Sequence, residues 1–315
     1  MSSKKMMNRA LLLSLCLLTS CYHVSDRIEP KIEYSVQDHY LKTLPATFTA
    51  LSKQEQREGW GHEYQIGIGF AKQFDLYQAI TAFKRALILI PQNNPRALEM
   101  QYEILFCYYL AKKYPEVIET FETSKLRAMT PEFPAYHDLL VILYEAYSAE
   151  DNTQAKDQIL QLIEASDPKT SEELNLSYNL AHGNIDVARA LAPTNSGFEE
   201  LLQSYESERK SISKAKSYNA LLPGAGYLYL GQRQSAVTAL LLNGLFIAAS
   251  TLCFIHHNPA AGAIFASFEC GWYFGGIYGA GEEAKFYNER LYEQKLGPVM
   301  NQERLFPIFT LKHAF

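Results

Sequence analysis

A long stretch with almost no charge, near the carboxyl end, most limits what this chain can fold into. Between Gln234 and Gly281 the single formally charged side chain is Glu269. The segment His256-His257-Asn258-Pro259 divides this stretch into two apolar halves, Ser235 to Ile255 and Ala260 to Gly281. Each half has about the 20 residues that a helix needs to cross a bilayer, and Asn-Pro favours a turn. The pattern predicts a membrane-associated helical hairpin, which with its flanking helices occupies residues 206–296.

The first twenty residues have the composition of a secretory signal. Three basic residues precede an apolar run at 11–18 that is too short to span a membrane, and small residues follow it. Leu18-Thr19-Ser20-Cys21 resembles the lipobox of bacterial lipoproteins, which implies cleavage before Cys21 and acylation of that residue, for example with palmitate. We therefore expect residues 1–20 to be a lipoprotein signal peptide and residues 21–51 to be a tether. More than one acyl chain holds a protein stably on a membrane.

The charge balance and the cysteine pattern exclude several classes of function. The chain has 34 acidic and 29 basic side chains, whereas nucleic-acid binding depends on basic side chains that neutralise phosphates. The cysteines have no spacing typical of a zinc site or a disulfide framework. No nucleophile–base pair or paired carboxylates stand out either. We therefore expect no nucleic-acid partner, no catalytic residues, no cofactor and no metal.

Helical periodicity from residue 52 to residue 205 is accompanied by a recurring motif. Ser52 and Glu55 have the spacing of a capping box, which predicts the start of a helix. Six residues have the spacing of a tetratricopeptide repeat: Gly67, Phe70, Ala79, Phe83, Ala86 and Pro91. The resemblance implies two antiparallel helices that pack closely at their small residues. The proline then ends the pair, because it cannot continue the helical hydrogen bonds.

The motif recurs further along the chain with some drift. Ala79, Val117 and Ala155 occupy one position of the repeat, and Phe83, Phe121 and Ile159 occupy another. A shorter fourth pair is predicted at Leu174–Ala181 and Ile185–Ala192. Such arrays bury a core only by stacking neighbouring units, and they present a groove that holds a peptide or partner protein. The predicted fold class is therefore all-α: a tetratricopeptide-like array over 52–205, followed by the apolar helical hairpin.

A glycine-rich motif opens the predicted membrane module. Pro223 to Gly231 has the pattern Pro-Gly-x-Gly-x-x-Tyr-x-Gly, in which no strand precedes the glycines, so a dinucleotide loop is disfavoured and a turn is expected. Together with Gly271 to Ala280, this motif resembles an uncharacterised carboxyl-terminal module of bacterial envelope proteins. That resemblance implies membrane association. An amphipathic helix at Glu282–Leu296 and a tail at residues 297–315 follow.

Small residues recur every fourth position in the second half of the hairpin: Ala263, Ser267, Gly271, Gly275 and Gly279. This spacing lets helices approach closely in lipid, so we expect the hairpin to pack on itself or on a second copy through the stripe. An ionisable group at membrane depth is a functional candidate by default. Hairpin geometry places Glu269 opposite Phe246 and within a turn of Asn243, which predicts a Glu269–Asn243 hydrogen bond that fixes the helix register.

The basic residues around the hairpin oppose a conventional inner-membrane span. A lipobox places the mature chain outside the cytoplasm, yet basic residues lie at the ends of the hairpin (209–216, Arg233, Lys285) and none lies in its turn. An inner-membrane span has the reverse bias. We therefore expect a protein of the bacterial cell envelope that is membrane-anchored and faces the periplasm, with the outer membrane favoured over the inner.

Together these patterns predict a non-enzymatic envelope lipoprotein that binds partner proteins through its repeats while it is held at a lipid bilayer. In outline it resembles the tetratricopeptide lipoproteins that assist outer-membrane protein assembly, which implies that its partners are other envelope proteins. The alternative is a component of a small membrane transporter or channel, with Glu269 and the glycine stripe at its centre.

Overall fold

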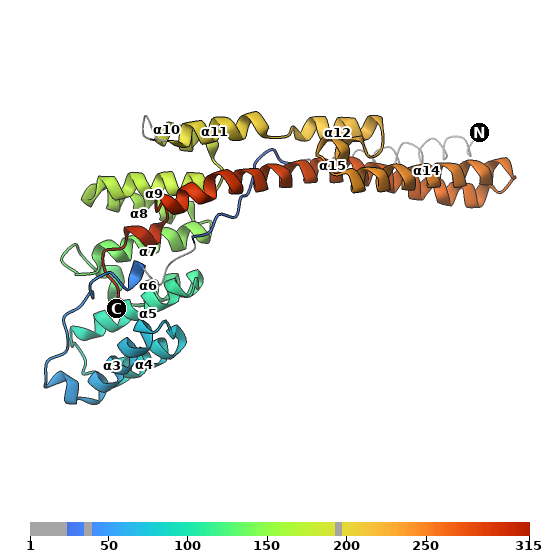
Figure 1. The fold of residues 1–315 in the computed structure, drawn as a ribbon. Coiled ribbons are helices and arrows are strands. Elements are labelled where there is room, and N and C mark those ends of the chain that lie inside the picture. Colours follow the sequence, from blue (N-terminus) through green and yellow to red (C-terminus); the bar gives the residue numbers. More distant parts are fainter. Residues whose placement is uncertain (1–23, 35–39, 193–196) are drawn as a thin grey trace, which may run out of the picture. The chain divides into compact units, whose positions relative to one another are not determined.

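The structure, a computed structural model, describes residues 24–34, 40–192 and 197–315 (Figure 1). The chain forms two compact units, which we describe separately. The array unit comprises residues 32–196 and 297–315, and the hairpin unit comprises residues 1–31 and 197–296. The described residues contain helices and one isolated parallel bridge, between Ala46 and Ala314, but no strand. The all-α prediction is therefore confirmed.

The array unit consists of four consecutive helical pairs, as the sequence predicts. The pairs are α3 (Gly59–Lys72) with α4 (Leu76–Leu89), α5 (Arg96–Leu110) with α6 (Tyr114–Thr123), α7 (Tyr136–Ala149) with α8 (Thr153–Ser166), and α9 (Pro168–Ala181) with α10 (Ile185–Leu191). Short 3-10 turns lie at Glu55–Arg57 and Lys125–Ala128. Each helix contacts the next one along the chain. Membership of the tetratricopeptide class stays a prediction.

Local chemistry explains where these helices begin. Asp75, Asn152 and Asp167 each precede a helix, and each side chain accepts a hydrogen bond from a backbone N–H of the first turn. The predicted capping box is confirmed. Ser52 N donates to Glu55 Oε2 at 2.7 Å and Glu55 N donates to Ser52 Oγ at 3.3 Å, so both donors at the start of the first 3-10 turn are satisfied.

The residues of the first repeat motif pack together in one hydrophobic core. Ala79, Phe83 and Ala86 are fully buried, and the half-buried Phe70 packs against the same cluster. A Cβ added to Gly67 would lie 2.6 Å from the ring of Phe83, so only glycine allows α3 and α4 to approach this closely. The later repeats are looser, because Phe121 and Ala155 are only half-buried.

Residues 40–51 of the predicted tether and residues 297–315 of the predicted tail belong to the array unit, which corrects their assignment as separate segments. Leu41 and Leu51 are buried, and so are Ile308 and Leu311 beside the 3-10 turn η3 (Pro307–Thr310). The unit ends at Ser196 rather than at residue 205, so helix α11 (Gly197–Glu208) belongs to the hairpin unit. Polar composition concealed these roles, because the few apolar residues of each segment are the ones that pack.

The hairpin unit contains, after α11, helices α12 (Ile212–Leu221), α13 (Ala225–Tyr229), α14 (Arg233–Ile255) and α15 (Pro259–Gln302), whose last turns from Gly297 belong to the array unit. Helices α14 and α15 run side by side in opposite directions (Figure 1). Ser250 Oγ donates to Gly262 O at 2.9 Å near the turn, and Gln232 Nε2 donates to Glu283 Oε2 at 2.6 Å near the other end. The predicted hairpin is thus formed.

The Pro-Gly-x-Gly motif forms the predicted turn. Gly224 has φ +95°, a conformation that glycine adopts without steric cost, and its N–H donates to Asn219 Oδ1 at 2.8 Å. Gly226 meets a different requirement: an added Cβ would lie 2.4 Å from Ala215 O in α12 and 2.8 Å from Ala280 Cβ in α15. The two glycines therefore allow a turn and a close helix contact, not phosphate binding.

The second apolar half differs from the prediction. Of the helices that the structure describes, α14 alone is long and apolar enough to cross a membrane, with a mean hydropathy of 2.0. Ala260–Gly281 lies in the 44-residue helix α15, where Glu269 and several glycines reduce the hydropathy. The amphipathic helix predicted at Glu282–Leu296 is part of the same helix and does not end at Leu296, because α15 continues through Pro298 to Gln302. Buried Met300 and a hydrogen bond from Asn301 Nδ2 to Glu33 O at 3.2 Å stabilise the last turns.

Candidate functional site

The array unit holds the carboxyl-terminal segment of its own chain, made of the 3-10 turn η3 and the extended residues 311–315, against helices α5 and α7. The segment 305–315 lies along α5 and α7, and its terminal Phe315 ring packs 4.8 Å from the ring of Phe106. The fully buried carboxylate of Asp138 accepts a hydrogen bond from Lys312 N at 2.8 Å and lies 2.9 Å from His313 Nδ1. A charged group on α7 therefore binds the segment through its backbone as well as through a side chain.

A second segment of the chain pairs with this one. The Tyr40 hydroxyl is the donor to two backbone carbonyls, Phe309 O at 2.9 Å and Leu311 O at 3.0 Å. Thr47 N donates to Ala314 O at 3.1 Å, and Ala314 N donates to Pro45 O at 2.9 Å. The carboxyl-terminal segment is therefore held by α7 and by this second segment together, through backbone contacts of the kind that a bound peptide uses.

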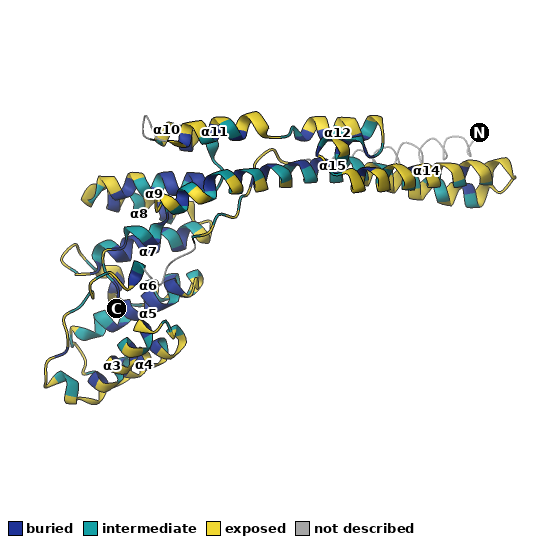
Figure 2. Cartoon of the chain, in the orientation of Figure 1, coloured by how far each residue is buried: buried dark blue, intermediate teal, exposed yellow. Residues whose placement is uncertain are grey.

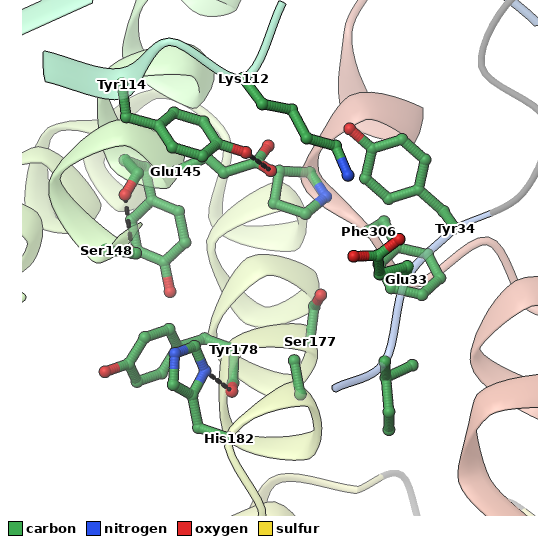
Figure 3. A pocket seen from close by; sticks show the side chains of 14 residues that line it. Glu33, Tyr34, Lys112, Tyr114, Glu145, Ser148, Ser177, Tyr178, His182 and Phe306 are labelled. Carbon is green, nitrogen blue, oxygen red and sulfur yellow. Dashed lines mark hydrogen bonds between the residues drawn. The ribbon is translucent and has the colours of Figure 1, made fainter. Parts of the chain in front are cut away.

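Next to Phe306 and Pro307 of the carboxyl-terminal segment, the array unit contains an aromatic cavity (Figure 3). Its volume is about 190 Å³. Six rings line it: Tyr34, Tyr114, Tyr144, Tyr178, His182 and Phe306. They come from the amino-terminal segment, α6, α7, α9, the end of α9 and the tail, so the cavity exists only when these separate segments are packed together. We call this space the aromatic cavity.

The carboxylate of Glu145 lies in the wall of the aromatic cavity. Tyr109 Oη donates to Glu145 Oε2 at 2.5 Å and Tyr114 Oη donates to Glu145 Oε1 at 3.1 Å. Burial raises the pKa of the Glu145 carboxyl, and the two tyrosine hydroxyls together with the charge of Lys112 oppose that rise. Among the described residues no cation lies within ion-pairing distance of this carboxylate. Neutral hydroxyls are its hydrogen-bond partners.

Two aromatic walls of the cavity already bind ammonium groups. Lys112 Nζ lies 5.4 Å from the centre of the Tyr34 ring, and Lys156 Nζ lies 3.8 Å from the centre of the Tyr178 ring. The Tyr178 ring also stacks on His182, with 4.0 Å between ring centres. These distances are typical of cation–π interactions. Two of the rings that line the cavity are therefore each in contact with one ammonium group of the array itself.

The predicted small-residue stripe does not join the two helices of the hairpin. An added Cβ at Gly271 or Gly275 would have no neighbour within 4 Å, whereas one at Gly279 would meet Tyr227 Oη at 2.6 Å. Ala263 and Ser267 are exposed, and Ser267 Oγ donates to Ala263 O of its own helix at 2.8 Å. The hairpin therefore does not pack on itself through the stripe, and packing on a second copy stays a prediction.

The predicted Glu269–Asn243 hydrogen bond is not formed in the described part of the hairpin unit. Asn243 Nδ2 donates instead to Ala239 O of its own helix at 2.6 Å. Neither Asn243 Oδ1 nor Glu269 Oε2 has a hydrogen-bond partner among the described residues. The register explains the difference, because Phe246 faces Phe268, with 6.2 Å between ring centres, rather than Glu269. Cys21, the predicted lipidation site, lies outside the described residues.

Sequence reasoning missed Glu145 and Asp138, although a signal for both was present. Each is an acidic residue within the otherwise apolar run 139–147 of α7 or directly before it. Charged side chains are rarely buried unless they are paired, so an acidic residue in an apolar helix indicates a buried polar partner. The partners themselves, Tyr109, Tyr114 and residues 312–313, lie too far away in the sequence to be recognised from it.

Comparisons with known proteins add no family to this description. No protein-family model matches the chain, and no curated protein or solved structure matches it. Fold and site define an all-α protein with a helical array that binds extended chain and contains an aromatic cavity.

Proposed function

We propose that this protein is a non-enzymatic scaffold of the bacterial cell envelope, which binds other envelope proteins through its helical array while it is held at a membrane. The observation that carries the proposal is the face of α5 and α7. It already binds the extended end of its own chain through Asp138, which accepts a hydrogen bond from Lys312 N, and it leaves the aromatic cavity open beside that segment. A surface that binds its own chain in this way has the chemistry to bind a partner's chain.

The hairpin supports the membrane part of the proposal. Much of α14 and of the adjoining part of α15 is exposed (Figure 2). The exposed residues include large apolar side chains: on α14 Val237, Leu240, Leu241, Leu245, Ile247, Leu252, Phe254 and Ile255, and on α15 Ile264, Phe268, Trp272 and Phe274. Continuous exposed apolar surface of this kind marks a membrane or protein contact. Acylation at Cys21 would supply a second attachment, with the array facing the periplasm and the outer membrane favoured.

Acylation has a direct test. In cells grown with labelled palmitate, the full-length protein is expected to carry label and the Cys21→Ala variant to carry none, because the thiol and the new amino group of Cys21 are the attachment points. Cys253→Ala is the matched control, since this cysteine lies within α14, and it should keep the label. Label that persists in Cys21→Ala would contradict the lipoprotein assignment.

Partner binding is tested with a photo-crosslinking amino acid placed in the full-length protein in cells. At position 182, beside the aromatic cavity, we expect discrete protein adducts on a denaturing gel. At position 77 on α4, where the native Tyr77 is 78% exposed, we expect none above background, because α4 contributes no residue to the aromatic cavity. The scaffold proposal fails when position 182 gives no more adduct than position 77.

The alternative, a component of a small transporter or channel, has one observation in its favour. Asn243 Oδ1 and Glu269 Oε2 are unpartnered within the hairpin unit, and Asn243 lines a cavity together with Gly271, Trp272 and Gly275. Buried polar groups without partners are costly and often functional. Under this alternative the crosslinker at position 182 captures no protein.

A further inference from the structure

We infer that the aromatic cavity binds a basic side chain, the ammonium of a lysine or the guanidinium of an arginine, presented by the partner protein. This inference rests on the proposed function and names the chemistry that the array recognises. It follows from three properties of the cavity: its walls, its acidic group and its size.

The walls favour a cation because aromatic faces attract positive charge. Tyr34 and Tyr178 each already have a lysine ammonium over the ring, at 5.4 Å and 3.8 Å. The remaining rings that face the cavity, Tyr114, Tyr144 and Phe306, have no such partner among the described residues. Cation–π contacts contribute about 0.5–1 kcal/mol each at exposed sites and more where water is excluded, so several rings around one cation act together.

Glu145 supplies the charge that a basic side chain needs. Its two oxygens accept hydrogen bonds from Tyr109 and Tyr114, which hold the carboxylate in place but leave its charge unbalanced. Each carboxylate oxygen has a second lone pair, so the group can still accept a bond from a ligand N–H. Burying an unpaired charge is costly, and a ligand cation would remove that cost.

The size of the cavity selects a single side chain. A volume of about 190 Å³ is below the roughly 300 Å³ at which pockets for drug-sized ligands begin. A slender aliphatic side chain with a charged end fits such a space, and a folded segment does not. Lys112, in the turn between α5 and α6, does not itself pair with Glu145, because its ammonium lies over Tyr34 instead. It is therefore a competitor for the cavity.

The test uses the full-length protein in detergent and three capped, fluorophore-labelled glycine peptides whose central residue is lysine, arginine or acetyl-lysine. Binding is followed by fluorescence anisotropy. We expect the lysine and arginine peptides to bind, and the acetyl-lysine peptide to bind about tenfold more weakly or not at all, because acetylation removes the charge that Glu145 and the rings recognise. This comparison needs no variant, so it does not depend on the folding of any mutant.

Two variants then locate the site. Glu145→Gln keeps an acceptor for the tyrosine hydroxyls and should weaken binding of the lysine peptide about tenfold. Glu164→Gln changes an exposed residue on α8 and should leave binding of this peptide unchanged. Lys112→Met removes the competing ammonium and should strengthen binding. Equal binding of lysine and acetyl-lysine peptides, or binding insensitive to Glu145→Gln, would overturn the inference. If the peptides failed in this way but crosslinking at position 182 still captured a protein, the scaffold proposal would stand and only the inference about a basic side chain would fall.

Discussion

Replacing Asp138 by alanine is expected to lower the free energy of unfolding of the array unit by about 2 kcal/mol, the order of the loss when hydrogen bonds to a buried acceptor are removed. The substitution removes the fully buried acceptor to which Lys312 N and His313 Nδ1 are bound. Residues 305–315 should then leave the face of α5 and α7. Trypsin should therefore cut after Arg304 and Lys312, sites that the native contacts protect.

The chain provides a reporter and a control for this experiment. Of its two tryptophans, Trp60 is buried in the core of the array unit, so in a Trp272→Phe background its fluorescence during urea unfolding follows this unit. Lys312→Ala is the matched control. It keeps the backbone N–H that Asp138 binds and removes only the exposed ion pair of Lys312 with Asp167 at 3.1 Å, which should cost less than about 1 kcal/mol. Equal losses in the two variants would contradict the role given to Asp138.

Replacing Gly226 by alanine is expected to destabilise the hairpin unit by about 1–3 kcal/mol, as overpacking of a close contact does. The new Cβ would lie 2.4 Å from a backbone oxygen of Ala215 and 2.8 Å from Ala280 Cβ. Because a backbone oxygen cannot turn aside as a flexible side chain can, α13 must separate from α12 and α15. In a Trp60→Phe background, Trp272 in α15 reports unfolding of this unit in detergent.

Gly275→Ala is the control for Gly226→Ala. Gly275 also lies in a helix, but an added Cβ there meets nothing within 4 Å. Alanine favours a helix interior by up to about 1 kcal/mol over glycine, so this variant should be neutral or slightly more stable. A destabilised Gly275→Ala together with an unchanged Gly226→Ala would show that the stripe, and not the Pro-Gly-x-Gly motif, is the close contact of the hairpin.

The features that the sequence predicted correctly depend on local chemistry or on short repeats. The capping box at Ser52 and Glu55, the turn at Gly224 and the helical pairs of the array are of this kind. Gly67 and Phe83 belong to one motif, so their contact followed from the spacing of that motif. The predicted register of the hairpin was wrong by one residue, since Phe246 faces Phe268 and not Glu269. Counting back from a turn does not determine which faces of two apolar helices meet.

The candidate site depends on contacts that have no local signature. Asp138 and His313 are 175 residues apart in the chain, and the walls of the aromatic cavity come from the amino-terminal segment, three helices and the tail. An acidic residue in an apolar helix indicates that a partner exists. It does not identify Tyr109, Tyr114 or the backbone of residue 312 as that partner.

The sequence by itself determined that this chain forms helical pairs and an apolar hairpin, because periodicity, caps and hydrophobicity act within a few turns of each residue. The tertiary structure decided that residues 40–51 and 297–315 complete the array, that Glu145 lies in an aromatic cavity, and that the glycine stripe stays unpacked within its own hairpin. The physical reason is the same in each case. An apolar side chain needs an apolar neighbour and a buried acidic side chain needs a hydrogen-bond donor, and the sequence shows both needs. Which residue meets each need is determined by the packing of distant segments.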